Sequence, residues 1–482
     1  MSSPAHLPAN APSRGDGYGA IATKLSRVLV WTIPFAAVLS LLVMAKTDWR
    51  GDEYTYVAGA KALGDWLAGR IAWNEAYAAV IGPGWFMPGA SVIGAPLFAL
   101  VEAPPQWLVR VWALAVNLGL CLAVLRAFAR TFGPVHRLAF LLFPMLAACW
   151  HISLVTLMPD IPAGLVGALA LLAAWRMALS DEVTWRSIAA LELFLAAAVY
   201  LRGPMLLLAL GLHALLVLIA LLRHQHGALR LFAGLIGLAL MIAPWSIAAT
   251  RHFGEPVLTT TNIPLVFAES FGNPARTCFG PCPAGQDIWP EWHYAEALSQ
   301  RTGENSLSIQ RRMMAASTTD LTLLSYLDQV GQHFTTFLLK PDGLVPMYME
   351  VAYGVPPALR PALGTVLHWL TLIAYLPFLI ALLAANVLRF RRSDGEMVQG
   401  LLIKLGTAVL FLQPFFHHTS ARYWQTFAPL AGWSAALLFT SLLRPVPAGP
   451  RTFPRWFDQA QLAYSAVFLA IAVTLVVAGL VA

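Results

Sequence analysis

The chain has 482 residues, of which 58% are hydrophobic and 11% are charged, whereas soluble proteins carry about a quarter charged residues. A soluble fold could not bury so many apolar side chains, so this composition excludes that class and indicates a membrane protein. The net charge of +7 does not indicate a nucleic-acid partner, because Lys and Arg lie in short loops between apolar runs, as the positive-inside rule describes.

Residues 1–25 are rich in Pro, Ser, Gly and Ala and predict a short disordered cytoplasmic tail. No small-residue cleavage site follows the first apolar run, so we expect a retained anchor rather than a removed signal peptide. Further runs of roughly 20 residues recur along the chain, the length needed to cross about 30 Å of hydrocarbon. The predicted spans are 26–46, 107–126, 138–158, 161–179, 188–201, 204–222, 230–250, 362–388, 400–415, 424–443 and 461–481.

The apolar segment 84–101 is interrupted by Pro88 and Pro96 and by three glycines. If it does not cross, the basic segments that follow the later spans all fall on the side of the basic N-terminal tail, as the positive-inside rule prefers. If it crosses, they all move to the other side. We therefore expect eleven spans, with 84–101 as a re-entrant or surface-lying hairpin, and twelve spans as the alternative.

The predicted fold class is an all-α polytopic membrane protein, a bundle of about eleven transmembrane helices with a large outer loop region. We expect a catalytic transmembrane module over 26–250 with a first outer loop at 47–106, an extracytoplasmic loop region at 251–361, and C-terminal transmembrane helices over 362–482. Outer loops this long are usually functional.

Two of the four cysteines, Cys278 and Cys282, lie in the outer segment in Thr-Cys-Phe-Gly-Pro-Cys-Pro. Outside the cytoplasm a disulfide across this small loop is expected. A metal site would need two more soft ligands, and none lies near in the sequence. Cys121 and Cys149 lie within apolar spans and are expected to be core residues.

The first outer loop carries adjacent acids, Asp52 and Glu53, directly after the first span. A polar cap on that span would explain them. An amphipathic helix is predicted to follow, since Tyr56, Ala60 and Leu63 recur at helical spacing, and it would hold the acids near the lipid headgroups.

A second acidic position, Asp160, lies in the turn between two spans, where a carboxylate is costly unless it faces water or a partner. A helix N-cap is the alternative. Arg202 and Arg422 are outer-side cations that the positive-inside rule does not explain; Tyr423 and His418 lie near Arg422. Two cations opposite two acidic positions predict a site that holds a phosphate while a carboxylate takes a proton.

These features resemble the GT-C superfamily of integral-membrane glycosyltransferases, which use polyprenyl-phosphate sugars. The likeness lies in the Asp-Glu pair, the Gly-Pro-Gly-Trp-Phe-Met-Pro stretch at 82–88, the acid before the fourth span, the Ala-Pro-Trp at 243–245 and the Arg-Tyr at 422–423. The pattern is most similar to bacterial aminoarabinose transferases of lipid A and to protein O-mannosyltransferases. One departure is that the aminoarabinose transferases carry charged residues before their Pro-containing element, where this chain has Ile81 and Gly82.

The resemblance implies an inverting sugar transfer with Asp52 as general base, Glu53 supporting it or orienting the acceptor, and Asp160 as the second acid of the site. Arg202, Arg422, Tyr423 and His418 would bind the lipid phosphate. A lipid phosphate is already a good leaving group, so no cofactor is required, although Asp52, Glu53 and Asp160 could bind a divalent cation.

The expected partners are a polyprenyl-phosphate sugar donor, a glycan, lipid or protein acceptor, and the lipid bilayer. The expected location is a bacterial inner membrane, with the active site on the periplasmic side. Two alternatives are a transporter or flippase of a lipid-linked sugar and a polymerase or ligase of surface polysaccharide. A transporter would favour internal repeats and charges at mid-depth, and neither is evident in the sequence.

Overall fold

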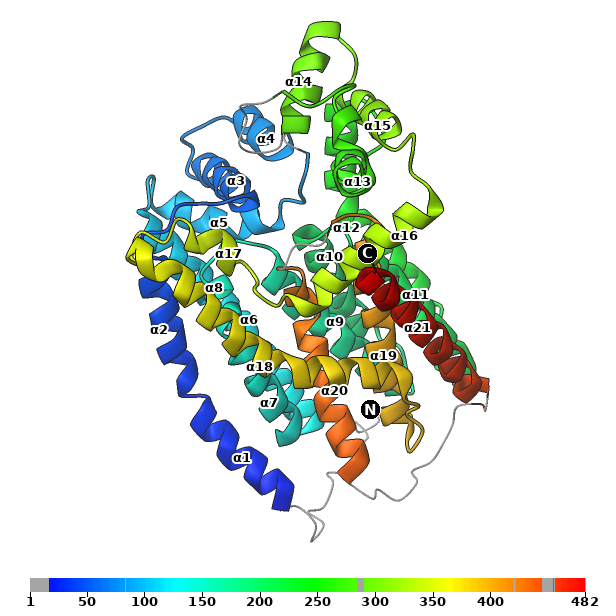
Figure 1. Ribbon diagram of the computed structural model, residues 1–482. Helices are drawn as coiled ribbons and strands as arrows, with labels where there is room; N and C mark the ends of the chain where they lie inside the picture. Colours follow the sequence, from blue (N-terminus) through cyan, green and yellow to red (C-terminus); the bar gives the residue numbers. More distant parts are fainter. Residues whose placement is uncertain are drawn as a thin grey trace.

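The computed structural model describes residues 17–82, 84–283, 290–418, 422–443, 454 and 456–481. Within these ranges all named elements are helices, and the only β pairing consists of two isolated bridges. Long helices form a bundle, and shorter helices gather at one of its ends (Figure 1). The predicted all-α membrane fold is confirmed.

Eight helical segments within the described residues are long and apolar enough to cross a membrane. They are α1 (Gly17–Leu29) continued by α2 (Thr32–Met44), α6 (Gln106–Phe132), α9 (Asp160–Leu179), α11 (Met205–Leu222), α12 (Arg230–Phe253), α18 (Arg360–Val387), α19 (Asp394–Leu410) and α21 (Trp456–Val481).

A ninth candidate span is broken, with a bend of 77° between Pro134–Met145 and Ala148–Leu154. It comprises α7 (Pro134–Phe140), the π-helical η1 (Leu141–Met145) and α8 (Ala148–Leu154). The other two predicted spans are also helices, α10 (Trp185–Leu201) and α20 (Trp424–Leu443). Each of the eleven predicted spans therefore coincides with a helix or a helix pair.

The interrupted segment 84–101 forms a single short helix, α5 (Gly89–Leu100). Its 12 residues extend only about 18 Å, less than the hydrocarbon thickness, so α5 is too short to cross. It packs against α3 (Asp52–Leu67). The two helices touch closely, because a Cβ at Gly64 would lie 2.4 Å from Cβ of Phe98. This contact fixes α3, which carries the Asp-Glu pair.

The N-terminal segment differs from the prediction of a disordered tail over 1–25. Helix α1 begins at Gly17, so the last third of the predicted tail is helical and extends the first span toward the N-terminus. Residues 1–16 lie outside the described residues. Gly17, Gly19 and Lys24 lower the mean hydropathy of this stretch without preventing a helix.

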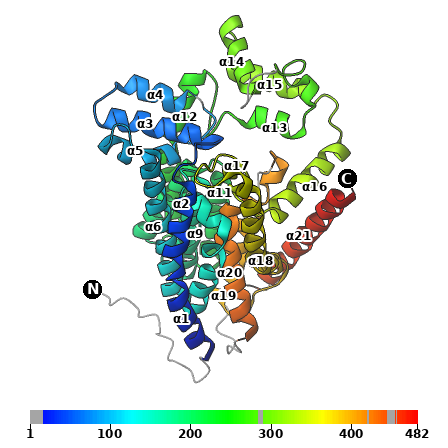
Figure 2. The same cartoon turned by 60° about the vertical axis from the view of Figure 1, so that its left-hand side comes forward.

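A group of short helices, here called the helical cap, lies at one end of the bundle in both views (Figures 1 and 2). It comprises α3, α4 (Trp73–Ile81), α13 (Ile263–Phe271), α14 (Pro290–Thr302) and α15 (Ser306–Ser317). From the cap the chain continues through α16 (Leu323–Leu339), which packs along α21, and α17 (Val345–Met349), which packs against α18. Short 3-10 turns lie at η2 (Pro274–Arg276), η3 (Pro357–Leu359) and η4 (Gln413–Phe415).

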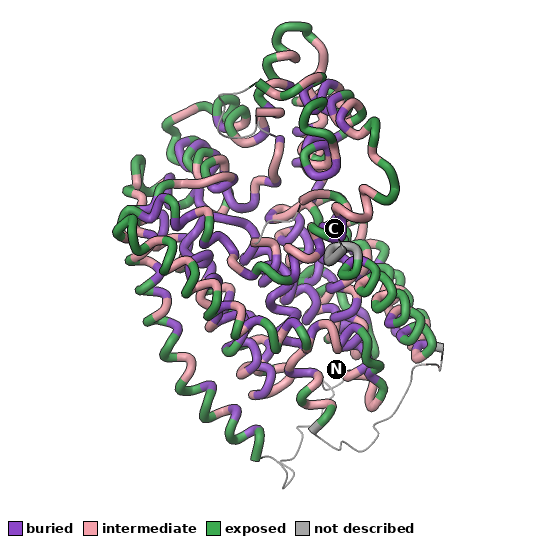
Figure 3. The backbone as a smooth tube through the Cα atoms, viewed as in Figure 1, coloured by how far each residue is buried: buried purple, intermediate pink, exposed green. Residues whose placement is uncertain are grey.

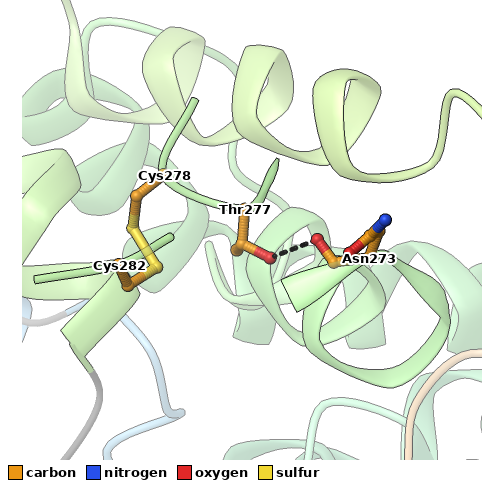
Figure 4. The surroundings of a disulfide bond; sticks show 4 residues. All are labelled: Asn273, Thr277, Cys278 and Cys282. Carbon is orange, nitrogen blue, oxygen red and sulfur yellow. Dashed lines mark hydrogen bonds between the residues drawn. A yellow bond between two sulfur atoms is a disulfide. The ribbon is translucent and has the colours of Figure 1, made fainter. Parts of the chain in front are cut away.

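The cap has its own small core, which includes Leu265, Trp292 and Met313. The predicted disulfide between Cys278 and Cys282 is present beside it, with the Cα atoms 4.9 Å apart (Figure 4). Cys121 and Cys149 are free and buried, as predicted.

Buried residues concentrate in the middle of the bundle, while exposed ones follow its periphery (Figure 3). Helix α9 is the most enclosed of the candidate spans, with 78% of its apolar window buried against 17% for α21. Large apolar side chains such as Phe35 and Leu240 point outward, exposed by 74% and 68%, which is the surface that lipid would cover. The enclosed helix α9 begins at Asp160.

Candidate functional site

Two carboxylates and two guanidinium groups meet where the bundle joins the helical cap. Asp52 pairs with Arg422, and Asp160 pairs with Arg202. A third contact joins the two pairs, since Nε of Arg422 lies 3.8 Å from Oδ2 of Asp160. None of the four side chains is more than 12% exposed. The four residues predicted from sequence to share a site are therefore brought together.

Both acids occupy the first position of a helix, Asp52 on α3 and Asp160 on α9. The unpaired backbone N–H groups and the dipole of a helix N-terminus favour a negative charge there. Gly51 makes the turn into α3 with φ of +51°, a conformation that a residue with a Cβ rarely adopts. Arg202 follows the last residue of α10, and Arg422 lies just before α20.

Aromatic and amide groups complete the surroundings of the two cations. The guanidinium carbons of Arg202 and Arg422 lie 4.4 and 5.1 Å from the ring centroid of Tyr423, within cation–π range. Nη2 of Arg202 also donates to Oε1 of Gln413 at 3.3 Å. Burial lowers the pKa of Arg422, but the charges of Asp52, Tyr423 and Asp160 together outweigh it, so this pKa is raised well above its usual value.

Tyr56, one turn beyond Asp52 on α3, is 4% exposed and lies within the electrostatic reach of all four charged groups. Burial and then the negative charge of Asp52 raise its pKa well above 10, so its phenol stays protonated at neutral pH. The sequence placed Tyr56 on an amphipathic helix but gave it no part in the site.

Glu53 faces a different set of partners from those of Asp52. Its Oε1 accepts from Nη1 of Arg110 at 2.6 Å and from the backbone N–H of Leu157 at 2.7 Å, and its Oε2 accepts from the hydroxyl of Tyr348. The carboxylate is completely buried, and these three contacts fix its orientation. The geometry favours the supporting role predicted for Glu53 over the alternative in which it orients an acceptor.

The partner of Glu53, Arg110, is completely buried within α6. It also donates to the carbonyl oxygens of Thr47 at 3.1 Å and Val155 at 3.4 Å. Its guanidinium carbon lies 4.4 Å from the centroid of Trp49. Sequence reasoning missed Arg110, although a lone Arg inside an apolar span is itself a signal.

His418 lies beside the charged cluster, against α13. Its backbone N–H donates to Oγ of Ser270 at 2.5 Å, and its Nδ1 lies 3.9 Å from Oε2 of Glu269. Burial and the charge of Arg422 lower the pKa of His418, so its ring is neutral at pH 7. A neutral His418 can donate one hydrogen bond to a phosphate, but it adds no charge to the clamp that the sequence predicted.

Glu269 was not singled out from the sequence. Burial, then Glu291 and Asp52, raise its pKa to about 7, although 38% of the side chain is exposed. The combination places a carboxylate that titrates near neutrality in an open position close to Asp52. Nothing in the sequence distinguishes Glu269, because single Glu residues are common in long outer segments.

The two adjacent acids do not share a ligand position. Asp52 faces Arg422, whereas Glu53 faces Arg110 and Tyr348. Across the part of the chain that the structure describes, no group of three or more His, Cys, Asp or Glu side chains could hold a metal ion. The binding of a divalent cation by Asp52, Glu53 and Asp160 together would require Glu53 to leave its buried partners.

Comparison with known proteins finds no matching protein-family model and no matching curated protein. Among solved structures, the chain is similar to ArnT from Cupriavidus metallidurans, in one crystal structure bound to undecaprenyl phosphate and in another in the apo state. The identity is 16% and the TM-score 0.36 in both cases, covering 88% and 87% of this chain and 77% of ArnT.

Proposed function

We propose that this protein is an inverting membrane glycosyltransferase that moves a sugar from a polyprenyl-phosphate donor to an acceptor hydroxyl. The proposal rests on one observation. At the end of an apolar bundle, the ion pair of Asp52 with Arg422 contacts the ion pair of Asp160 with Arg202. This arrangement supplies two guanidiniums for a lipid phosphate and two carboxylates for a hydroxyl, within reach of the bilayer.

In the proposed reaction, the acceptor oxygen forms a bond to the anomeric carbon as the bond from that carbon to the phosphate oxygen breaks. The bonding electrons leave with the lipid phosphate, and the acceptor proton passes to Asp52. Attack opposite the leaving group inverts the anomeric centre. Arg202 and Arg422 stabilise the charge that develops on the phosphate, and no cofactor is needed for these steps.

The ion pair with Arg422 occupies Asp52 before a donor binds. A phosphate that binds Arg422 competes with Asp52 for the same N–H donors, which releases Asp52 to act as a base. Donor binding then precedes proton transfer, and Asp52 is unmasked only when a leaving group is in place.

Asp160 has a second role in this proposal. Its Oδ2 is buried and accepts no hydrogen bond from the described residues, while Oδ1 is held by Arg202. Nε of Arg422, at 3.8 Å, is beyond hydrogen-bond distance of Oδ2. A buried acceptor without a hydrogen bond is costly, and a hydroxyl of the sugar or of the acceptor would supply one. Asp160 would thus orient a substrate hydroxyl while Asp52 takes the proton.

The proposal places the site on the periplasmic side of a bacterial inner membrane. Its support is the positive-inside pattern, which puts the helical cap opposite the basic loops. The donor would reach the site from the bilayer, and a lipid, glycan or protein acceptor would reach it through the cap.

The test is sugar transfer in membranes that contain a pool of labelled polyprenyl-phosphate sugars. Asp52→Asn should lower transfer by about 10²- to 10⁴-fold, while Asp48→Asn, an exposed acid in the same loop, should leave it unchanged at matched expression. Transfer that persists in Asp52→Asn would remove this residue from the mechanism. Movement of the labelled lipid across the membrane without transfer would support a transporter instead.

A further inference from the structure

A hollow lies away from the charged cluster, between α17 and the first turns of α18. Its volume is about 570 Å³, within the range of small-molecule sites. Val345 and Met349 of α17 line it. Tyr348, on the same short helix, instead contacts Glu53, so α17 separates this hollow from the residues of the proposed transfer reaction.

The length of α18 would put the hollow at the depth of lipid headgroups. Helix α18 has 28 residues and is about 42 Å long, which matches a bilayer including its headgroup regions. The lining residues of α18 fall between Arg360 and His368, in its first turns. Trp369 and Tyr353 nearby are exposed by 56% and 58%, as aromatic side chains at a membrane interface commonly are.

The lining combines one strong cation with carboxylates. Arg360 donates from Nε to the carbonyl of Val355 at 3.0 Å and from Nη1 to that of Glu350 at 2.8 Å. These bonds fix the guanidinium and use two of its five N–H donors. Asp342 pairs with His368 and keeps 20% of its side chain exposed. The carboxylate of Glu350 lies 3.7 Å from Nη2 of Arg50 and is 73% exposed, so it remains open to a further donor.

We propose that this hollow binds the headgroup of a membrane phospholipid that carries a primary ammonium, of the phosphatidylethanolamine class. The phosphate would take the remaining N–H donors of Arg360, and the ammonium would donate to Asp342 and Glu350. The acyl chains would lie along exposed apolar side chains on the same flank of α18 as Thr365, namely Trp369, Leu376 and Ile380.

The charges distinguish this lipid from others at the same depth. A phosphatidylglycerol headgroup has no cation to match the two carboxylates, and its net negative charge would lie beside them. A choline headgroup has the cation but no N–H, so it cannot donate a hydrogen bond to a carboxylate. A lipid held here would brace α17 against α18 and thereby support Tyr348.

The experiment uses the full chain in vesicles of equal parts phosphatidylethanolamine, phosphatidylcholine and phosphatidylglycerol. The protein is extracted in mild detergent, and retained lipids are counted by native mass spectrometry. Wild type should retain phosphatidylethanolamine preferentially, and Arg360→Gln and Asp342→Asn should each weaken retention about five- to tenfold. Arg276→Gln and Asp320→Asn, which alter an exposed ion pair of the outer segment, should not.

A third variant separates lipid loss from misfolding. Thr365→Trp fills the hollow from an exposed position of α18 without removing a charge, and it should also release the lipid. Equal retention of the three lipids by wild type would overturn the proposal. So would unchanged retention in folded Arg360→Gln and Asp342→Asn. Neither result depends on glycosyl transfer, since no activity is measured.

Discussion

Removing Arg110 should destabilise the protein strongly, because it leaves Glu53 as an unpaired charge in the interior. Both side chains are 0% exposed, and they are 2.6 Å apart. Breaking a buried ion pair by removing one partner costs about 3–5 kcal/mol. Arg110→Met keeps most of the packing volume of the side chain and removes the charge, so we expect its free energy of unfolding to fall by that amount.

The assay is unfolding in mixed micelles with increasing denaturing detergent, followed by the fluorescence of the 17 tryptophans. Arg276→Met is the matched control, because Arg276 and Asp320 form a pair that is 48% and 62% exposed. Exposed pairs contribute at most about 1 kcal/mol. Equal losses in the two variants would refute the assignment of Glu53 and Arg110 as a buried structural pair.

A double variant tests the cause of the loss. Glu53→Gln removes the unpaired charge, keeps an oxygen that can accept from the backbone N–H of Leu157, and places an NH2 group that can donate to the hydroxyl oxygen of Tyr348. Adding it to Arg110→Met should therefore restore part of the lost stability. If the two losses simply add, the cost arises from packing rather than from the stranded carboxylate.

Three further outcomes are expected. Asp160→Asn should abolish most transfer. It should still bind polyprenyl phosphate at least as tightly as wild type in a flotation assay, because it frees Arg202. Arg202→Gln should weaken the same binding about tenfold. The pKa of Glu269 is raised to about 7 in the folded protein, so the protonated side chain stabilises the fold fully at pH values below its ordinary pKa. This contribution is lost as the pH rises through 7. Glu269→Gln should therefore flatten the decline in the free energy of unfolding measured from pH 5 to 8. Replacing Cys278 and Cys282 by Ser should cost about 2 kcal/mol, seen as faster hydrogen exchange in α13 to α15 but not in α9.

The meeting of Asp52, Asp160, Arg202 and Arg422 could be predicted because it depends only on counting spans. Each residue lies at the end of an apolar run, and an odd or even number of crossings fixes its side of the membrane. The bundle then brings these ends together. The same count predicted that 84–101 does not cross, and α5 is too short to do so.

The separate roles of Asp52 and Glu53 could not be read from their adjacency. Successive residues on a helix point about 100° apart, so Asp52 faces Arg422 while Glu53 faces Arg110. Tyr348 was missed for another reason: it lies in an outer segment without a clear hydrophobic period, so its position depends on tertiary packing alone.

The two acidic residues of the site begin helices that differ in how deeply they are buried. Asp160 begins the helix with the largest buried share among the candidate spans, whereas Asp52 begins a 16-residue helix of the cap, held by α5 and by Glu53. Segments with fewer buried contacts open at lower free energy. On warming, the Asp52 side should therefore loosen while Asp160 still holds Arg202, so the protein would lose its proposed base well before it loses its fold.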